Sequence, residues 1–134
     1  EYTRARIIEV EPERILKELE EDRIVVVAGF QGITENREIT TLGRGASDTT
    51  AVALAAGLSA KICEIYTDVE GIYTTDPRIV PEARLLEEIG YEEMMEMASY
   101  GAKMHPRSIE LGAMYNIPIL VTSSFTDTPG TLIH

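Results

Sequence analysis

Two glycines flank an arginine just before a predicted helix, in the segment Gly43-Arg44-Gly45-Ala46-Ser47-Asp48. Glycines let the backbone approach a ligand closely, and a helix N-terminus presents unpaired N–H groups that attract anions. The forked guanidinium of Arg44 is suited to a carboxylate or a phosphate. One interpretation is therefore an anion-binding loop. The other is a plain turn in which Ser47 or Asp48 caps the helix, and these residues taken alone favour the turn.

A second polar segment follows a predicted buried strand and runs from Tyr66 to Arg78. It contains two Thr-Asp pairs, two tyrosines and an arginine. Ligands of open α/β sheets bind beyond the carboxyl ends of the strands, where this segment offers ring faces for a base and donors for a polyphosphate. Asp and Thr also bond readily to nearby backbone groups, so a loop that satisfies its own polar groups is an equal alternative.

Lys103 and Arg107 surround the start of another predicted helix, where their charges and the helix N-terminus would attract an anion. A solvated helix junction explains the same residues and is favoured on these residues alone. His105 is interpreted as structural, because it has no metal-ligand spacing to the other histidine, His134. Cys63 lies in a β-type run and is interpreted as part of the core.

The residues around these segments predict alternating strands and helices. The expected strands cover residues 24–28, 61–67 and 117–121, and the expected helices cover residues 13–21, 51–58 with a start near Ser47, 91–100 and 106–115. Shorter β-type runs lie at 7–10 and 131–133, and residues 33–42 indicate either a small hairpin or an exposed excursion. The unalternating apolar run 24–28 is typical of a strand covered on both faces. This order predicts an α/β fold with a mostly parallel sheet.

Composition narrows the class of protein further. The chain has 134 residues, enough for one domain. Its 23 acidic and 12 basic residues give a net charge of −11, which argues against nucleic acid or an anionic membrane as the main partner. The longest apolar run, residues 24–30, is far shorter than the roughly 20 residues of a membrane span. One cysteine excludes an internal disulfide, and no apolar leader opens the sequence, so we expect a cytoplasmic protein.

Taken together, four ordered motifs resemble the aspartate kinases of the amino acid kinase family. They are Val27-Ala28-Gly29-Phe30-Gln31-Gly32, residues 41–48, residues 67–78, and Gly101-Ala102-Lys103 before His105-Pro106-Arg107-Ser108; the ending, residues 123–133, is similar too. The resemblance implies a three-layer α/β/α sandwich with a mostly parallel sheet. It also implies transfer of the ATP γ-phosphate, with Mg²⁺, to the β-carboxylate of L-aspartate, the first step toward lysine, threonine and methionine.

The same resemblance implies roles for individual residues. Arg44 and Ser47 match aspartate-binding positions, and Asp48 matches an aspartate that organises the transition state. Nucleotide-binding positions are matched by Thr67, Asp68, Tyr73, Arg78, Lys103 and Met104, and no residue is assigned to a metal. The attacking carboxylate has an ordinary pKa of about 3.9 and is already ionised at neutral pH. Asp48 is therefore expected to orient cationic groups or the substrate ammonium, not to abstract a proton.

The sequence departs from the family pattern in three places. The family begins with a strand carrying Lys and then Phe-Gly-Gly-Thr-Ser, which is not found here. Residues 1–134 are therefore interpreted as the C-terminal, nucleotide-binding part of the kinase domain, without the regulatory domains that usually follow, and little or no activity is expected of it alone. Ala46 replaces a second glycine. One residue separates Lys103 from His105 where the family generally has two, which would turn a helix by about 100°.

Three alternatives stay open at this point. The first is another kinase of the same fold, acting on glutamate, uridylate or carbamate, although the 43–48 loop together with residues 67–73 favours aspartate. The second is a non-catalytic module that binds nucleotide. The third is a folding fragment whose apolar face once contacted a missing half. For the full-length protein we expect a homo-oligomer.

Overall fold

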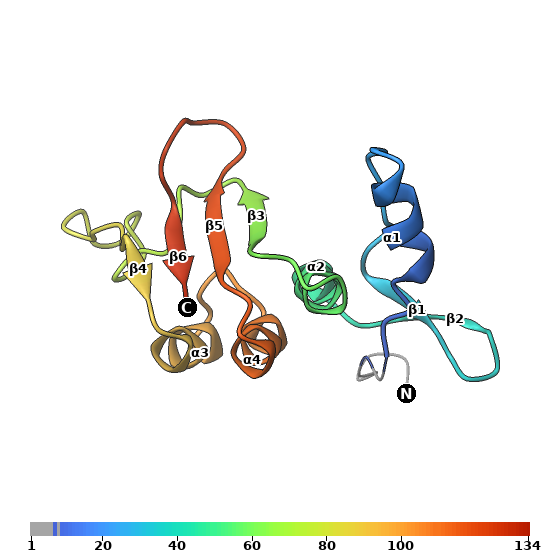
Figure 1. Ribbon diagram of the computed structural model, residues 1–134. Helices are drawn as coiled ribbons and strands as arrows, with labels where there is room; N and C mark the ends of the chain where they lie inside the picture. The colour runs from blue at the N-terminus through green and yellow to red at the C-terminus, as the bar shows by residue number, and fades with distance from the viewer. Residues whose placement is uncertain (1–6, 8) are drawn as a thin grey trace.

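The computed structural model describes residue 7 and residues 9–134 (Figure 1). The described elements are, in order, α1 (Glu13–Glu20), β1 (Gln31–Ile33), β2 (Ile39–Thr41), α2 (Ala46–Gly57), β3 (Cys63–Thr67), β4 (Glu88–Ile89), α3 (Tyr91–Ser99), α4 (Pro106–Tyr115), β5 (Ile119–Ser123) and β6 (Thr131–Ile133). The second half contains two strands, then two helices, then two strands that join the first two in one sheet, and the predicted α/β class is confirmed. None of the helices in the described part of the chain is long and apolar enough to cross a membrane.

The main sheet has four strands in the order β3-β5-β6-β4. β3 pairs with β5 in parallel, and β4 pairs with β6 in parallel, whereas β5 and β6 are antiparallel. The sheet is therefore mostly parallel, as predicted, with one antiparallel pair at its centre. β1 and β2 form a separate antiparallel hairpin, which agrees with the hairpin alternative for residues 33–42, except that its first strand begins earlier, at Gln31.

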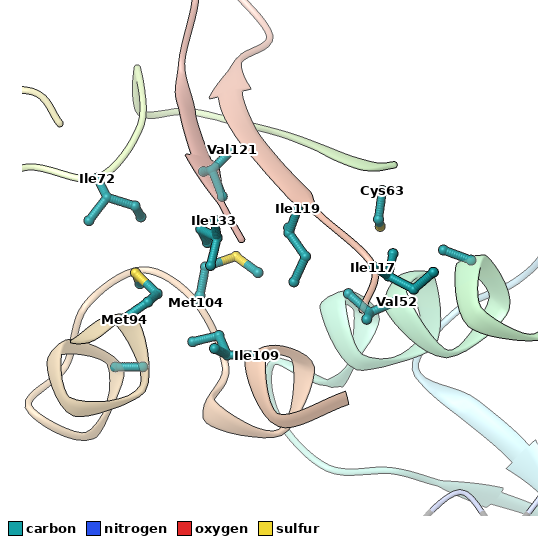
Figure 2. Close-up of a cluster of buried hydrophobic side chains, with 12 residues drawn as sticks. Val52, Cys63, Ile72, Met94, Met104, Ile109, Ile117, Ile119, Val121 and Ile133 are labelled. Carbon is teal, nitrogen blue, oxygen red and sulfur yellow. The ribbon is translucent and has the colours of Figure 1, made fainter. Parts of the chain in front are cut away.

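The core lies between the strands and a layer of three helices, α2, α3 and α4. Figure 2 shows buried side chains of β5 and β6 pointing toward the helices, with Met94 of α3 and Ile109 of α4 facing them. Met94, Ile109, Ile119 and Ile133 are fully buried. On the opposite face of β3, Tyr66 is 62% exposed. The described residues thus form the sheet and one helical layer of the expected three-layer arrangement.

The second half of the chain matches its predicted elements closely. α4 spans the predicted residues, and α3 ends one residue earlier than expected. Gly101 and Asn116 follow these helices with left-handed backbones, at φ values of 99° and 53°, and this conformation terminates a helix. β5 begins at Ile119 and not at residue 117, since Pro118 precedes it and has no N–H to donate to a ladder. β4, a strand of two residues, was not predicted.

The first part of the chain differs most from the prediction. α1 forms as expected, but none of its residues is buried. Residues 24–28 do not form a strand, so that prediction is wrong: Ile24 is 95% exposed and Val26 is 92% exposed. No described strand lies beside them to complete a ladder, and a strand without neighbours has nothing to bury its faces against. Of the predicted run 7–10, residue 8 lies outside the described residues and the other three are not in a strand.

Candidate functional site

A cavity of about 230 Å³ opens where α2, β3 and the segment before α4 meet. It is lined by Ser47, Asp48, Ile65, Tyr66, Thr67, Lys103, Met104 and Val121. These residues come from distant parts of the sequence, including all three polar segments identified above. Because β3 runs parallel to β5, the carboxyl ends of both strands lie at the same edge of the sheet, which is where α/β folds bind ligands.

The first turn of α2 presents Ser47 and Asp48 to this cavity. The N-cap is Gly45, with φ of 74°, and it makes no side-chain capping bond. The interpretation in which Ser47 or Asp48 merely caps the helix is therefore wrong, because both lie inside the first turn. The preceding Gly43 is also left-handed, at φ 105°, and glycine tolerates this backbone. Ala46 is already helical, so replacing the family's glycine there brings no strain.

Asp48 is half-buried at the cavity wall, and burial raises the pKa of its carboxyl above the ordinary value. A hydrogen bond from the backbone of His105 and the positive charge of Lys103 oppose this shift. The helix N-terminus adds a partial positive charge on the same side. Asp48 is therefore a partly desolvated carboxyl group whose pKa depends on the cations around it.

Lys103 and Asp68 form an ion pair beside the cavity, with Nζ and Oδ1 2.5 Å apart. Thr67 also donates to Asp68, through Oγ1 at 3.1 Å. The bond from Lys103 is the main reason that the pKa of Asp68 lies below its ordinary value. Residues 103–105 are not helical. The missing residue before His105 thus does not rotate a helix, and Lys103 still reaches the site.

The remaining predicted nucleotide-binding residues lie in the loop between β3 and β4, outside the cavity lining. The Tyr73 hydroxyl donates to Glu70 at 2.8 Å. Arg78 makes a two-pronged contact with Asp76, at 3.0 and 2.8 Å, and its side chain is 87% exposed. The buried hydroxyl of Thr131 in β6 holds this loop, because it accepts a hydrogen bond from the backbone N–H of Ile72 at 2.9 Å.

The structure thus gathers five of the nine predicted site residues around one cavity: Ser47, Asp48, Thr67, Met104 and Lys103. Asp68 is tied to it through Lys103. Arg44 is exposed next to the α2 N-terminus and does not line the cavity. Tyr66 also lines the cavity; the sequence prediction included it in the second polar segment but gave it no binding position of its own. The sequence indicated Tyr66 through its position, one residue before the end of a strand that is predicted to lead into a site.

Two further observations concern clusters of metal-ligating side chains and a second cavity. No group of three or more His, Cys, Asp or Glu side chains that could hold a metal occurs among the described residues. A second cavity, of about 180 Å³, lies between α2 and α4 and has mainly apolar walls, such as Leu42, Leu111 and Met114. It contains none of the nine residues assigned to the site, although Arg107, considered with Lys103 as an anion ligand, lies in its wall.

Comparison with known proteins agrees with the motifs. The sequence profile of the amino acid kinase family matches residues 2–123. An aspartate kinase of Pseudomonas putida is 58% identical over 133 residues, which are 98% of this chain and 32% of that protein. The chain therefore spans about a third of the length of the curated relatives it matches.

Solved structures give the same likeness. Aspartate kinase from Synechocystis superposes with a TM-score of 0.79 at 60% identity, covering 92% of this chain and 21% of that one. E. coli aspartokinase III in complex with aspartate and ADP superposes with a TM-score of 0.83 at 42% identity, covering 91% of this chain and 28% of that one.

Proposed function

This chain belongs to the amino acid kinase family, and we propose that it is the C-terminal, nucleotide-binding part of the catalytic domain of an aspartate kinase. The complete enzyme would transfer the γ-phosphate of ATP to the β-carboxylate of L-aspartate, giving an acyl phosphate. The observation that carries this proposal is the convergence of Ser47 and Asp48 with Thr67 and Lys103 on one cavity. The aspartate and ADP bound to the E. coli relative support both substrates.

The geometry suits a reaction between two anions. A carboxylate nucleophile is ionised at neutral pH, so catalysis depends on positioning and on neutralising the charge of the transferred group. The α2 N-terminus and Lys103 supply positive charge at the cavity. Asp48 lies in the first turn of α2 and lines the same cavity as Lys103. We assign it to orienting these cations or the substrate ammonium, and Arg44 to the substrate carboxylate.

The residues present fit a nucleotide in several respects. Lys103 is a flexible point charge of the kind that binds phosphates, and it lines the cavity together with Thr67 and Tyr66. Tyr73 and Arg78, in the loop that follows β3, would extend the contact. Mg²⁺ is held in kinases by one or two carboxylates together with substrate phosphates, and Asp48 is the carboxylate that lines the cavity. When bound, the ion would supply charge neutralisation.

Further parts of the proposal concern the complete protein. We assign it to the first step of lysine, threonine and methionine synthesis, to the cytoplasm, and to a homo-oligomeric state. The isolated chain is proposed to have little or no kinase activity, because the lysine-bearing strand of the family is not among its residues. Turnover by the isolated chain near that of a full enzyme would contradict this part alone.

The test uses the complete kinase that contains this segment and compares it with its Asp48→Asn variant. A coupled assay with ATP and L-aspartate should show a fall in kcat of about 100-fold, as expected when a group that organises charge in the transition state is lost, with ATP affinity by calorimetry nearly unchanged. Asp22→Asn is the matched control, because Asp22 is exposed beyond α1 and asparagine tolerates its left-handed backbone, φ 57°. Loss of ATP binding in Asp48→Asn would contradict the assignment of Asp48.

Two other functions are separated by the same protein. Absence of activity on aspartate with activity on glutamate, uridylate or carbamate would indicate another kinase of this fold. ATP binding without any transfer by the complete protein would indicate a nucleotide-binding module. The match at 58% identity to an aspartate kinase favours the first proposal over both.

A further inference from the structure

His105 links the start of α4 to the glycine-rich loop that precedes α2. It is the N-cap of α4, and its ring Nδ1 accepts the backbone N–H of Arg107 at 3.2 Å. Its carbonyl accepts two bonds from the fully buried Ser108, from the hydroxyl at 2.6 Å and from the backbone N–H at 2.9 Å. Three hydrogen bonds therefore fix both the backbone and the ring orientation of this residue.

The same residue touches the α2 loop in two ways. The edge of its ring lies against Gly45, where an added Cβ would be 3.3 Å from Cδ2 of His105. Its backbone also lowers the pKa of the Asp48 carboxyl, so the two residues are neighbours at the start of α2. Gly45 is the N-cap of α2, so the ring supports the turn from which Ser47 and Asp48 project into the cavity.

We propose that His105 is a positioning residue for phosphoryl transfer: it holds the α2 N-terminus, and with it Asp48, in register with the cavity that Lys103 and Thr67 complete. This inference rests on the proposed function and assigns a role to a residue that the sequence indicated only as structural. His105 does not line the cavity, so it acts through Gly45 and Asp48 and not on substrate.

The two duties of the His105 side chain can be separated by substitution. Asparagine is among the best N-cap residues, so His105→Asn keeps an acceptor for the α4 cap but removes the ring edge that supports Gly45. His105→Ala removes both. A residue that serves only to cap α4 would therefore be replaced well by asparagine, whereas a positioning residue would not.

The experiment measures steady-state kinetics and melting temperature in the complete kinase. His105→Asn should keep the melting temperature within about 1 °C of wild type, since the cap is retained, yet lower kcat/KM for aspartate about tenfold or more, as displacement of reacting groups does. The KM for ATP should not change. His105→Ala should lose melting temperature and turnover together. His134→Asn is the matched control, because His134 is exposed, contacts Glu88 and lies outside the cavity lining.

Three outcomes would overturn the inference. They are wild-type turnover in His105→Asn, a fall in turnover that follows the melting temperature through both variants, and failure of His105→Asn to fold although the cap is kept. Failure of the proposed function looks different, because the wild-type protein would then not phosphorylate aspartate at all.

Discussion

The hydroxyl of Thr131 provides a test of how the site loop is held. Thr131 begins β6 and is fully buried. Its Oγ1 accepts the backbone N–H of Ile72 at 2.9 Å and donates to the carbonyl of Leu86 at 2.6 Å. Both ends of the loop between β3 and β4 are thus tied to one hydroxyl. Gly71 approaches so closely that an added Cβ would lie 2.6 Å from this oxygen.

Thr131→Val keeps the shape of the side chain and removes both hydrogen bonds. The Ile72 N–H and the Leu86 carbonyl then lose their partner in a region where Ile72 is only 3% exposed. Each buried group left unpaired costs about 1–3 kcal/mol, so the two together should destabilise the fold by about 2–6 kcal/mol. Thr131→Ser keeps the hydroxyl and loses one methyl group, which should cost about 1 kcal/mol.

The assay is hydrogen exchange on the complete protein, together with its unfolding midpoint in denaturant. In Thr131→Val the amide of Ile72 should exchange at least about tenfold faster, which corresponds to 1.4 kcal/mol or more, and ATP affinity should fall because the loop carrying Tyr73 and Arg78 is released. Thr131→Ser should retain slow exchange at Ile72. Equal stability of the two variants, or unchanged exchange at Ile72 in the valine variant, would refute the reasoning.

Three further predictions concern single side chains. Lys103→Ala should raise the pKa of Asp68, which NMR titration of its carboxyl carbon measures. Because the ion pair lowers that pKa, its contribution to folding stability is present above pH 3.8 and is lost as the pH falls through the lowered pKa. The stabilities of the wild type and the variant should therefore converge in acid. Cys63 should resist thiol reagents at pH 8 until denaturant is added, since burial and nearby carboxylates raise its pKa to about 11. The isolated chain should bind an apolar dye, and Val26→Lys should reduce this, because Val26 is 92% exposed.

The sequence predicted most of the second half of the fold because its signals there are local. Pro106 opens α4 and Asn116 ends it in the left-handed conformation, and both preferences belong to single residues. Residues 51–58 predicted a helix with a start near Ser47, and the observed helix begins one residue earlier, at Ala46, after the left-handed Gly45. β4 has two residues and is too short for any periodicity to show.

The apolar segment 24–28 shows where local signals stop. Five consecutive apolar residues indicate a strand covered on both faces, but the cover must come from elsewhere in the chain or beyond it. The chain just after this segment is held against α2, because the N–H of Phe30 donates to Oγ1 of Thr50 at 3.2 Å. The segment therefore leads to the N-terminal end of α2, while Ile24 and Val26 have no described neighbour that buries them. The apolar pattern of residues 24–28 indicates that both faces need to be covered, but the pattern does not show which part of the protein covers them.

At the candidate site, the net charge of the whole chain and the charges next to the cavity lead to different expectations. A net charge of −11 argues against large polyanions, because their binding depends on the field of the whole protein. It says little about a small anion, because Debye screening limits distant charges to a reach of about 8 Å at physiological salt. Within that range the cavity has Lys103 and the first turn of α2. Asp68 already pairs with Lys103, so a bound phosphate would have to compete with a carboxylate for the same ammonium. Affinity for ATP should therefore respond to changes at Asp68 as well as at Lys103, although Asp68 does not line the cavity.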